Sequence, residues 1–236
     1  MADPAYDFHI HTCLSPCGDN DMTPNNIVNM ALLKELDIIA VTDHNSVSNC
    51  EAVIKAADGT GLKVIPGMEL CTAEEVHMVC LFGSLDKGKQ FEEFVFDNLP
   101  DIKNRPEIFG EQIIMNEQDE KVGEFDKLLI NASMITIDEA VNKVKELEGI
   151  CYPAHIDKSS NSIISNLGFI PEEYGFQLVE AADLKKVTSA EEYSEIYKRY
   201  AVIHSSDAHY LWDISEREYF LTSDIVERVP FFKQYI

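Results

Sequence analysis

The sequence predicts an α/β protein built from about seven βα units around a parallel sheet. Short apolar runs alternate with helical patterns along most of the 236 residues. Most of these runs are rich in β-branched residues and end in a histidine or a carboxylate, as expected at the carboxyl edge of a buried sheet. A chain of this length with 45% hydrophobic residues has enough material for one large core, so residues 1–236 are expected to form a single domain.

Four of the expected strands lie in the first half of the chain. They are residues 6–11, 37–44, 63–70 and 77–83. Thr23 followed by Pro24 has the pattern of an N-cap and a first helical residue, and it opens an amphipathic helix that ends near Leu36. A second helix is expected over about residues 48–57, and apolar residues at core spacing over 91–95 indicate a third.

Three more strands are expected in the second half. They are residues 149–155, 176–182 and 201–209. Two capping boxes predict the starts of helices. Thr136 with Glu139 lies before the strand over 149–155, and Ser189 with Glu192 lies before the strand over 201–209.

Residues 101–133 interrupt this alternation. The stretch is polar and has no clear helical period, and its segment EQIIMNEQDEKVG is compatible with a hairpin. Long excursions inside a compact domain are usually functional or disordered. Because LLINAS returns as an apolar segment, an ordered insertion over the mouth of the barrel is favoured.

The charge and the cysteines exclude several classes of protein. A formal net charge of −23 disfavours long nucleic acid and anionic membranes as partners, because such binding depends on Lys and Arg. No stretch approaches the roughly 20 apolar residues of a membrane span, and the start lacks the pattern of a signal peptide, so a cytoplasmic protein is expected. Its cysteines are then expected to be reduced. Four of them are expected as small core residues, namely Cys50, Cys71, Cys80 and Cys151.

Histidines and carboxylates at the strand ends carry the chemistry. His9 and His11 are two apart on a strand, so their side chains leave the same face and can bind one ion together. The groups that end the other runs are Asp43, His44, Glu69, His155, Asp207 and His209, and His77 opens the run over residues 77–83. Any one of them alone is better interpreted as a core histidine or a capping aspartate, but together they predict a polynuclear metal site. The carboxylate of Glu69 offers two oxygens with which to bridge two cations.

These motifs resemble a known family. HIHT, TDHN, IPGMEL with the later His77, PAHID and SDAH are similar in order and spacing to the PHP (polymerase and histidinol phosphatase) family, from about Asp7 to Tyr210. The resemblance implies a distorted (β/α)7 TIM-like barrel with two or three metal ions at the carboxyl ends of its strands. Many members hydrolyse phosphoesters.

The resemblance also implies three overlapping ligand sets. A first ion is assigned to His9, His11, Glu69 and Asp207, a second to Glu69, His77 and His155, and a third to His44 and His209. Relatives often add a histidine or an SDG aspartate to the third set, whereas this chain reads SPCGDND. Cys17 or Asp19 is the alternative ligand there, and a surface cysteine without a role is the competing interpretation of Cys17. Mixed imidazole and carboxylate ligands suit zinc, manganese or iron better than magnesium or calcium.

Further residues are expected beside the ions. Asp43 is either a ligand or, preferably, the partner that orients a histidine, and His209 is expected to hold phosphate oxygens or the leaving group. Lys158 is a candidate for gripping the substrate phosphate, with an ordinary surface lysine as the alternative. Glu180 is expected beside the pocket, and His204 is expected to be a core or pocket histidine and not a ligand.

The expected function is that of a metal-dependent phosphoesterase. It would hydrolyse a small phosphorylated metabolite, such as a nucleotide, sugar phosphate or amino-alcohol phosphate, through a metal-activated water. The acidic composition ranks a polymerase-associated exonuclease lower. An amidohydrolase-type barrel is one alternative, although those enzymes usually have eight strands and often a bridging modified lysine. A catalytically inert PHP module is another, which the loss of several ligands would mark.

Overall fold

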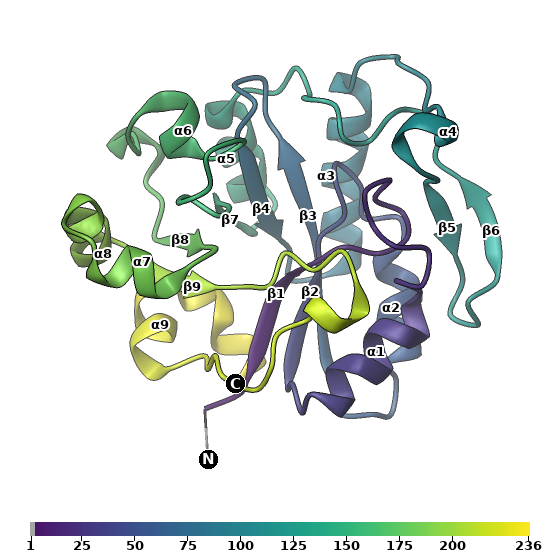
Figure 1. Cartoon of the computed structure of the whole chain (residues 1–236), viewed down its shortest axis with the longest axis horizontal. Coiled ribbons are helices and arrows are strands. Elements are labelled where there is room, and N and C mark those ends of the chain that lie inside the picture. The colour runs from purple at the N-terminus through teal and green to yellow at the C-terminus, as the bar shows by residue number, and fades with distance from the viewer. Residues whose placement is uncertain (1–2) are drawn as a thin grey trace.

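The computed structural model describes residues 3–236 and contains the seven expected strands in the expected order (Figure 1). These strands are β1 (Tyr6–Ile10), β2 (Ile38–Val41), β3 (Lys63–Cys71), β4 (His77–Leu81), β7 (Ile150–Pro153), β8 (Leu178–Ala181) and β9 (Ala201–His204). The first five form one curled sheet in the order β1-β2-β3-β4-β7, and β8 pairs with β9. The chain therefore has the predicted mixed α/β fold of a distorted barrel.

One strand runs against the predicted direction. β1, β2 and β3 are parallel, but β4 is antiparallel to both β3 and β7. The expectation of a wholly parallel sheet built from seven βα units was wrong here, because residues 72–76 form a turn too short for a parallel crossover. The reversal pairs His77 with Cys71, so His77 lies at the edge where β3 ends.

The barrel is incompletely closed by strand pairing. Within residues 3–236 no ladder joins β7 to β8, although Ile156 N donates to Glu180 O at 2.9 Å. A single parallel bridge between Ile10 and Ala208 connects β1 to the segment after β9. Loops therefore complete the barrel at two places on its carboxyl edge.

Helices surround the curled sheet (Figure 1). They are α1 (Pro24–Leu33), α2 (Cys50–Ala56), α3 (Leu85–Asn98), α5 (Ile137–Glu146), α6 (Ile163–Leu167), α7 (Leu184–Ser189), α8 (Ser194–Arg199) and α9 (Ser223–Arg228). The core has two main parts, one between the sheet and these helices and one inside the barrel. The 3-10 helix η4 (Pro230–Tyr235) closes the interior at the amino end of β1, where the rings of Phe8 and Phe232 stack 4.9 Å apart. No helix within residues 3–236 has the length and apolar character that crossing a bilayer requires.

The predicted helix caps differ in outcome. Thr136 caps α5, because its Oγ1 accepts from Glu139 N at 3.3 Å while Glu139 Oε2 accepts from Thr136 N at 2.9 Å. The capping box predicted at Ser189 was wrong, since Ser189 is the last residue of α7 and its hydroxyl donates to Lys185 O. A box that was not predicted opens α6 at Ser162.

This difference provides a matched pair of variants. Thr136→Ala is expected to lower the free energy of unfolding by about 1 kcal/mol, the usual effect of losing an N-cap hydroxyl. Ser189→Ala should change it by less than about 0.5 kcal/mol, as for a surface position without a cap. Denaturant midpoints of the two variants measure the difference, and equal destabilisation would contradict the assignment of these caps.

The insertion is an ordered flank of the barrel (Figure 1). It contains the short helix α4 (Pro106–Phe109) and the predicted hairpin, formed by β5 (Ile113–Met115) and β6 (Lys121–Glu124). Asp119 in the hairpin turn accepts hydrogen bonds from Thr23 Oγ1 at 2.8 Å and Asn25 N at 3.0 Å, at the start of α1. Ile113 N donates to Cys13 O at 3.0 Å, which joins the inner strand to the loop after β1. The insertion is thus fixed beside that loop, and its placement over the barrel mouth stays a prediction.

The cysteines are free thiols. Cys50, Cys71 and Cys80 are buried, as expected for small core residues, and Cys151 is half-buried. Cys17 is exposed, on the loop that follows β1.

Candidate metal centre

Side chains from separate strands converge at the carboxyl edge of the barrel. Six of the seven histidines lie there, together with two carboxylates. The residues are His9 and His11 of β1 and its end, His44 after β2, Glu69 of β3, His77 of β4, His155 after β7, and Asp207 and His209 after β9. The structure therefore brings together the histidines and carboxylates that the sequence placed at strand ends, apart from Asp43.

The four residues predicted for a first ion form one compact group. His9 Nε2 lies 3.3 Å from His11 Nε2, 3.3 Å from Glu69 Oε1 and 3.4 Å from Asp207 Oδ1. His11 Nε2 lies 3.4 Å from Glu69 Oε2 and 3.1 Å from Asp207 Oδ1. A tetrahedron of nitrogen and oxygen ligands about 2.0–2.1 Å from a metal ion has edges of about 3.3 Å. The spacing of these donor atoms therefore fits a single ion at their centre.

Glu69 lies at the middle of the cluster. Its Oε1 is 2.8 Å from His77 Nδ1 and 3.2 Å from His155 Nε2, and its Oε2 is 2.9 Å from His44 Nδ1. The side chain is 1% exposed. A buried carboxylate with imidazoles on both oxygens could bridge two cations, and this role of Glu69 stays a prediction.

A third group consists of His11, His44 and His209. The ring centroid of His11 lies 4.2 Å from the ring centroid of His209 and 4.5 Å from the ring centroid of His44. Among residues 3–236, Cys17 and Asp19 belong to none of the groups with metal-ligand spacing. Asp19 contacts His209 through the backbone, since its N–H donates to His209 O at 2.9 Å, while its carboxylate accepts from Asp21 N. The loop is thus beside the third group, but these side chains do not complete it.

Unpartnered atoms test whether this donor set fits metal ions. His44 Nδ1, Glu69 Oε2 and His155 Nδ1 are buried and make no hydrogen bond within the described chain. His44 Nδ1 and Glu69 Oε2 are nevertheless only 2.9 Å apart. Buried polar atoms without partners are costly. Two such atoms can lie this close without a hydrogen bond when the lone pairs of both point at the same cation. The donor set therefore fits metal ions.

The charges of the cluster are strongly coupled. Burial alone would lower the pKa of His77, but the Glu69 carboxylate and Cys71 together outweigh it, and the pKa is raised to about 10. Burial, together with the neighbouring His11, lowers the pKa of His44 to about 4 and that of His209 to about 3. In the metal-free protein some of these imidazoles therefore carry an extra proton. A bound metal ion would displace that proton.

Two residues of the cluster have strained backbones. Asp207 has φ +52° and His155 has φ +30°, in the left-handed region that residues with a β-carbon rarely adopt. Hydrogen bonds hold both conformations, since Ala208 N donates to His9 O and His155 N donates to Glu180 Oε1 at 3.2 Å. Such strain costs about 1–3 kcal/mol and is concentrated at functional sites.

An outer layer of hydrogen bonds orients the β1 histidines. Glu180 Oε1 lies 2.9 Å from His9 Nδ1, which leaves Nε2 facing the other donors. His11 Nδ1 lies 2.9 Å from Ser15 Oγ, and Ser15 Oγ donates to Asp43 Oδ1 at 2.7 Å. Such partners fix the ring orientation of a ligand histidine.

Asp43 has this orienting position. Its Oδ1 also accepts from Thr12 N at 2.7 Å, and its Oδ2 accepts from Thr12 Oγ1 at 2.8 Å. Both oxygens are therefore engaged by the loop after β1, and the role of Asp43 as a partner that orients a histidine stays a prediction. Ser15 and Thr12 could not be predicted from the sequence, because a hydroxyl beside a histidine motif has no distinctive spacing.

Loss of the Ser15 hydroxyl is expected to weaken metal binding. Ser15→Ala leaves His11 Nδ1 without its partner, so the affinity for zinc or manganese should fall about 10- to 100-fold. Competition with a chelator measures the dissociation constant. Ser46→Ala is the matched control, because Ser46 is a buried serine that bonds Ser48 and Glu92, outside the cluster. Equal affinities of the two variants would contradict the orienting role.

Two other predicted residues lie at the margin. Lys158 is half-exposed and its Nζ pairs with Asp207 Oδ2 at 2.5 Å, so it reaches the rim of the cluster. His204 Nδ1 donates to Ala181 O at 3.0 Å, and its ring lies 4.2 Å from that of Tyr219. His204 is half-buried, and among residues 3–236 it belongs to none of the groups with metal-ligand spacing.

Comparisons with known proteins agree with this arrangement. The model of the PHP domain matches residues 7–150. An uncharacterized protein of Methanocaldococcus jannaschii is 32% identical over 98 residues, which cover 38% of this chain and 57% of that protein. The 5′-3′ exoribonuclease Rnm of Salmonella typhimurium is 32% identical over 80 residues, which cover 33% of this chain and 26% of that protein. The chain thus spans little more than half of the first relative and about a quarter of the second.

Solved structures share the fold. A protein of Bifidobacterium adolescentis proposed to be a metal-dependent phosphoesterase has a TM-score of 0.63 at 18% identity, with 97% of this chain and 96% of that chain covered. The lesion-specific endonuclease PfuEndoQ of Pyrococcus furiosus has a TM-score of 0.62 at 18% identity, with 89% and 49% covered. An amidohydrolase of Chromobacterium violaceum has a TM-score of 0.61 at 15% identity, with 95% and 96% covered.

Proposed function

This chain belongs to the PHP domain family, and from its buried histidines and carboxylates we propose that it is a metal-dependent phosphoesterase. The observation that carries the proposal is the arrangement around Glu69, where three overlapping groups of donor atoms meet at one edge of the barrel. Nearly the whole predicted ligand set is present, and its spacing suits divalent transition metals such as zinc, manganese or iron.

The residues have separable roles in this proposal. His9, His11, Glu69 and Asp207 would hold one ion, and His77 and His155 would share Glu69 with a second. Bound ions of this kind neutralise phosphate oxygens and lower the pKa of water. Hydrolysis then adds a water oxygen to phosphorus, breaks the bond to the ester oxygen and delivers a proton to that leaving oxygen.

Two side chains at the rim face the space where a phosphate would enter. His209 is the most exposed histidine of the third group, and it is positioned to bind a phosphate oxygen or the leaving group. The Lys158 ammonium is held at Asp207. A cation held through Asp207 Oδ1 would leave Lys158 at Oδ2, where its ammonium could donate hydrogen bonds to a substrate phosphate.

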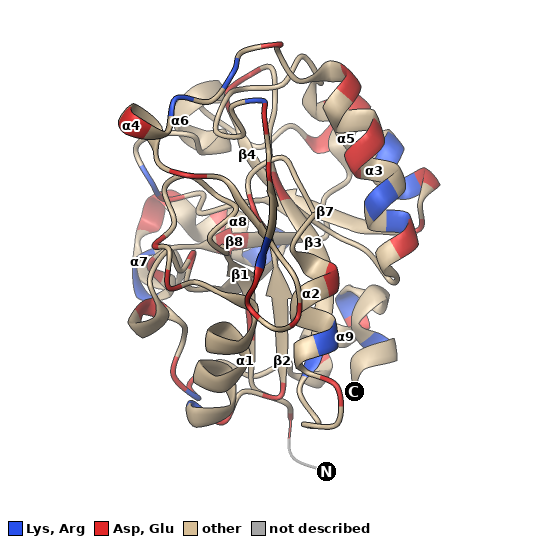
Figure 2. Cartoon of the chain, turned by 90° about the vertical axis from the view of Figure 1, so that its right-hand side faces the viewer, with Lys and Arg blue, Asp and Glu red and all other residues tan. Residues whose placement is uncertain are grey.

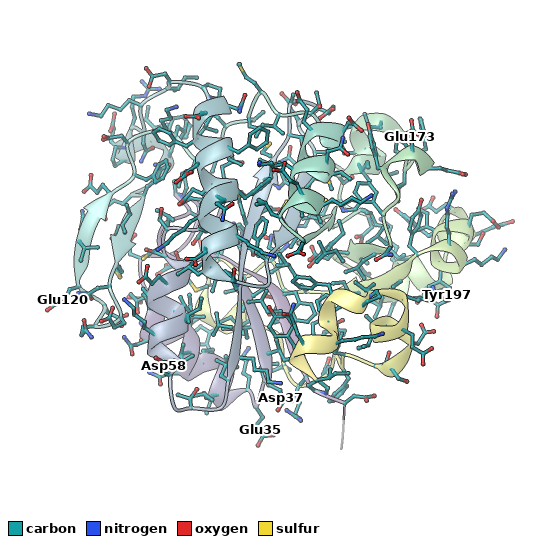
Figure 3. The ribbon with its side chains drawn as sticks, turned by 180° about the vertical axis from the view of Figure 1, so that it is seen from behind. Glu35, Asp37, Asp58, Glu120, Glu173 and Tyr197 are labelled. Atoms are coloured by element: carbon teal, nitrogen blue, oxygen red, sulfur yellow. The ribbon has the colours of Figure 1, made fainter. Side chains whose placement is uncertain are left out.

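The surface favours a small substrate. The 42 acidic residues outnumber the 19 Lys and Arg, and Figure 2 shows acidic positions on many elements. Figure 3 shows labelled side chains such as Glu35, Asp58, Glu120 and Glu173 around the edge of the molecule. Long nucleic acid would be repelled by such a surface. Because Rnm is a 5′-3′ exoribonuclease, the end of a short RNA stays among the candidates, beside nucleotides, sugar phosphates and amino-alcohol phosphates.

The alternatives differ from this site in specific ways. An amidohydrolase-type centre often bridges its ions with a modified lysine, whereas here a glutamate, Glu69, has the bridging position and Lys158 lies at the rim. The fold likeness to an amidohydrolase does not distinguish the two chemistries. A catalytically inert module would have lost several of the ligand residues. The chain keeps nearly the full set, so this alternative is disfavoured.

A substrate panel tests the proposal. The purified protein, with its metal per chain measured, is assayed on nucleoside monophosphates, sugar phosphates, amino-alcohol phosphates, short RNA, and amide and ester substrates. We expect at least one phosphoester to be hydrolysed, with the activity lost in chelator and restored by zinc, manganese or iron. Hydrolysis of amides alone would favour the amidohydrolase alternative. Fewer than one ion per chain after metal-replete growth would favour the inert module.

A further inference from the structure

We propose that Asp7 and Lys34, called here the loop clamp, are positioning residues for the metal centre. They hold residues 206–215, called here the ligand loop, so that Asp207 and His209 reach the donor atoms of the other strands. Neither clamp residue belongs to the groups with metal-ligand spacing within residues 3–236. The inference rests on the proposed function, because it concerns the metal centre of that phosphoesterase.

The ligand loop has little regular structure of its own. It follows β9, contains the 3-10 helix η3 (Leu211–Asp213), and is joined to β1 by the bridge between Ile10 and Ala208. In Figure 1 this yellow-green segment crosses β1 and turns beside α1. Because few ladder hydrogen bonds fix the loop, its shape depends on side chains from other elements.

Asp7 closes the two ends of the ligand loop. Its Oδ1 accepts from Ser206 N at 3.1 Å, its Oδ2 accepts from Ser215 N at 2.9 Å, and the side chain is fully buried. A carboxylate can accept hydrogen bonds on both sides, whereas an asparagine side chain has one oxygen and one NH2 group. The position therefore requires an aspartate and not only a side chain of its size.

Lys34 holds the far side of the loop. It directly follows α1, and its Nζ donates to the carbonyls of Trp212, at 2.9 Å, and Ile214. The same Nζ lies 3.0 Å from Glu216 Oε1, and the Lys34 side chain is 8% exposed. A buried ammonium is costly unless acceptors surround it. The loop is thus held at its ends by an anion and along its outer part by a cation.

The clamp acts directly beside the strained residue of the loop. Asp207 has φ +52°, and the residue before it, Ser206, donates its N–H to Asp7. The residue after it, Ala208, accepts from His11 N at 3.0 Å. In this conformation Asp207 Oδ1 lies 3.1 Å from His11 Nε2. A strained backbone persists only when its surroundings hold it, so release of Ser206 should move the carboxylate out of the spacing that fits an ion.

A loop that is ordered before the metal arrives makes binding tighter, because less binding energy is spent on ordering it. Positioning and charge make different predictions for the two clamp residues. Asp7→Asn removes a negative charge, and Lys34→Met removes a positive charge. If charge alone mattered, the first variant would bind a divalent cation more weakly and the second would bind it more tightly. If the clamp orders the ligand loop, both variants bind the cation more weakly.

The test is competition with a chelator for zinc or manganese. Asp7→Asn should raise the dissociation constant about 10- to 100-fold, as for other partners that hold metal ligands in place. Lys34→Met should raise it by roughly 5-fold, equivalent to about one hydrogen bond. Asp119→Asn is the matched control, because Asp119 also accepts on both oxygens, from Asn25 N and Thr23 Oγ1, but ties the hairpin to α1. This control should bind metal as the wild type does.

Thermal unfolding in excess chelator separates positioning from stability. A residue with a structural role alone lowers the melting temperature of the metal-free protein and leaves the dissociation constant unchanged at temperatures where the protein is folded. Combining Asp7→Asn with Asp207→Asn should weaken metal binding less than the sum of the two single effects, because Asp7 acts through Asp207. Unchanged or tighter metal binding by Lys34→Met would overturn the proposal, even if Asp7→Asn did not fold.

The failures of the two proposals are distinguishable, because metal affinity is measured without turnover. If the wild type binds metal but hydrolyses no phosphoester, the proposed function is wrong, and the dissociation constants of the variants still decide the role of the clamp. If both clamp variants bind metal as the wild type does and the wild type hydrolyses a phosphoester, the clamp is wrong while the phosphoesterase stands.

Discussion

Replacing His9 and His11 together by alanine is expected to remove bound metal and phosphoesterase activity at once. Both imidazoles belong to the group with Glu69 and Asp207, and His11 also belongs to the group with His44 and His209. The double variant thus lacks two of the four donor residues in the group with Glu69 and Asp207, and one of the three donor residues in the group with His44 and His209. Activity should fall at least about 1000-fold, a loss of about 4 kcal/mol of transition-state stabilisation.

Three measurements on the same samples check this result. Elemental analysis gives metal per chain, an aryl phosphate assay gives activity, and thermal unfolding with and without added metal gives stability. Metal that binds only the native state raises its melting temperature. The wild type should show this rise and the double variant should not, while its circular dichroism spectrum remains that of a folded protein.

His204→Ala is the control for losing a histidine from the same end of the barrel. His204 is half-buried at the end of β9, but it bonds Ala181 O and packs on Tyr219, away from the donor groups. It should keep its full metal content and activity. Wild-type hydrolysis by the double variant would contradict the proposed function directly.

The order of the strands was predictable from the sequence, but the direction of one of them was not. Apolar runs ending in polar groups identify strands, whereas hydrophobic periodicity is the same for a strand running in either direction. The short connection over residues 72–76 was the available signal that β4 reverses. Because of the reversal, His77 at the start of β4 lies beside the end of β3, where its Nδ1 is 2.8 Å from Glu69 Oε1.

The convergence of these histidines and carboxylates was predictable because metal chemistry restricts the residue types and the barrel restricts their positions. The residues that support them were not. Ser15, Asp43 and His11 form a chain of contacts whose members are up to 32 residues apart, and a serine in a loop carries no pattern of its own. Asp7 and Lys34 likewise act on a loop about 180 or more residues away, which only the folded chain reveals.

Helix caps show the same limit on a smaller scale. The local pattern of a capping box was correct at Thr136 and wrong at Ser189. At Ser189 the helix α7 was already ending, so the hydroxyl bonds back to Lys185 O instead of opening a new helix. A short pattern identifies a helix start only where the preceding chain is not helical.

Replacing Glu69 by glutamine is expected to have the second large effect. Burial would raise the pKa of Glu69, but the imidazoles of His77, His9 and His44 hold it well below its usual range, so the residue is a carboxylate. Glutamine keeps the shape and removes the negative charge that two ions would share. The variant should retain at most the one ion that His11, His44 and His209 hold without Glu69, and its activity should fall about 1000-fold or more.

The same substitution should change the pH dependence of stability in the metal-free protein. The raised pKa of His77, about 10, stabilises the native state below the unfolded pKa of about 6.5, and this stabilisation is lost as the pH rises toward 10. Because Glu69 causes the shift, Glu69→Gln should lower the melting temperature more at pH 6 than at pH 10. Glu92→Gln is the control, since Glu92 accepts from Val47 N and Ser48 Oγ away from the histidines. A Glu69→Gln protein with two or more ions and normal activity would show that this carboxylate does not bridge the centre.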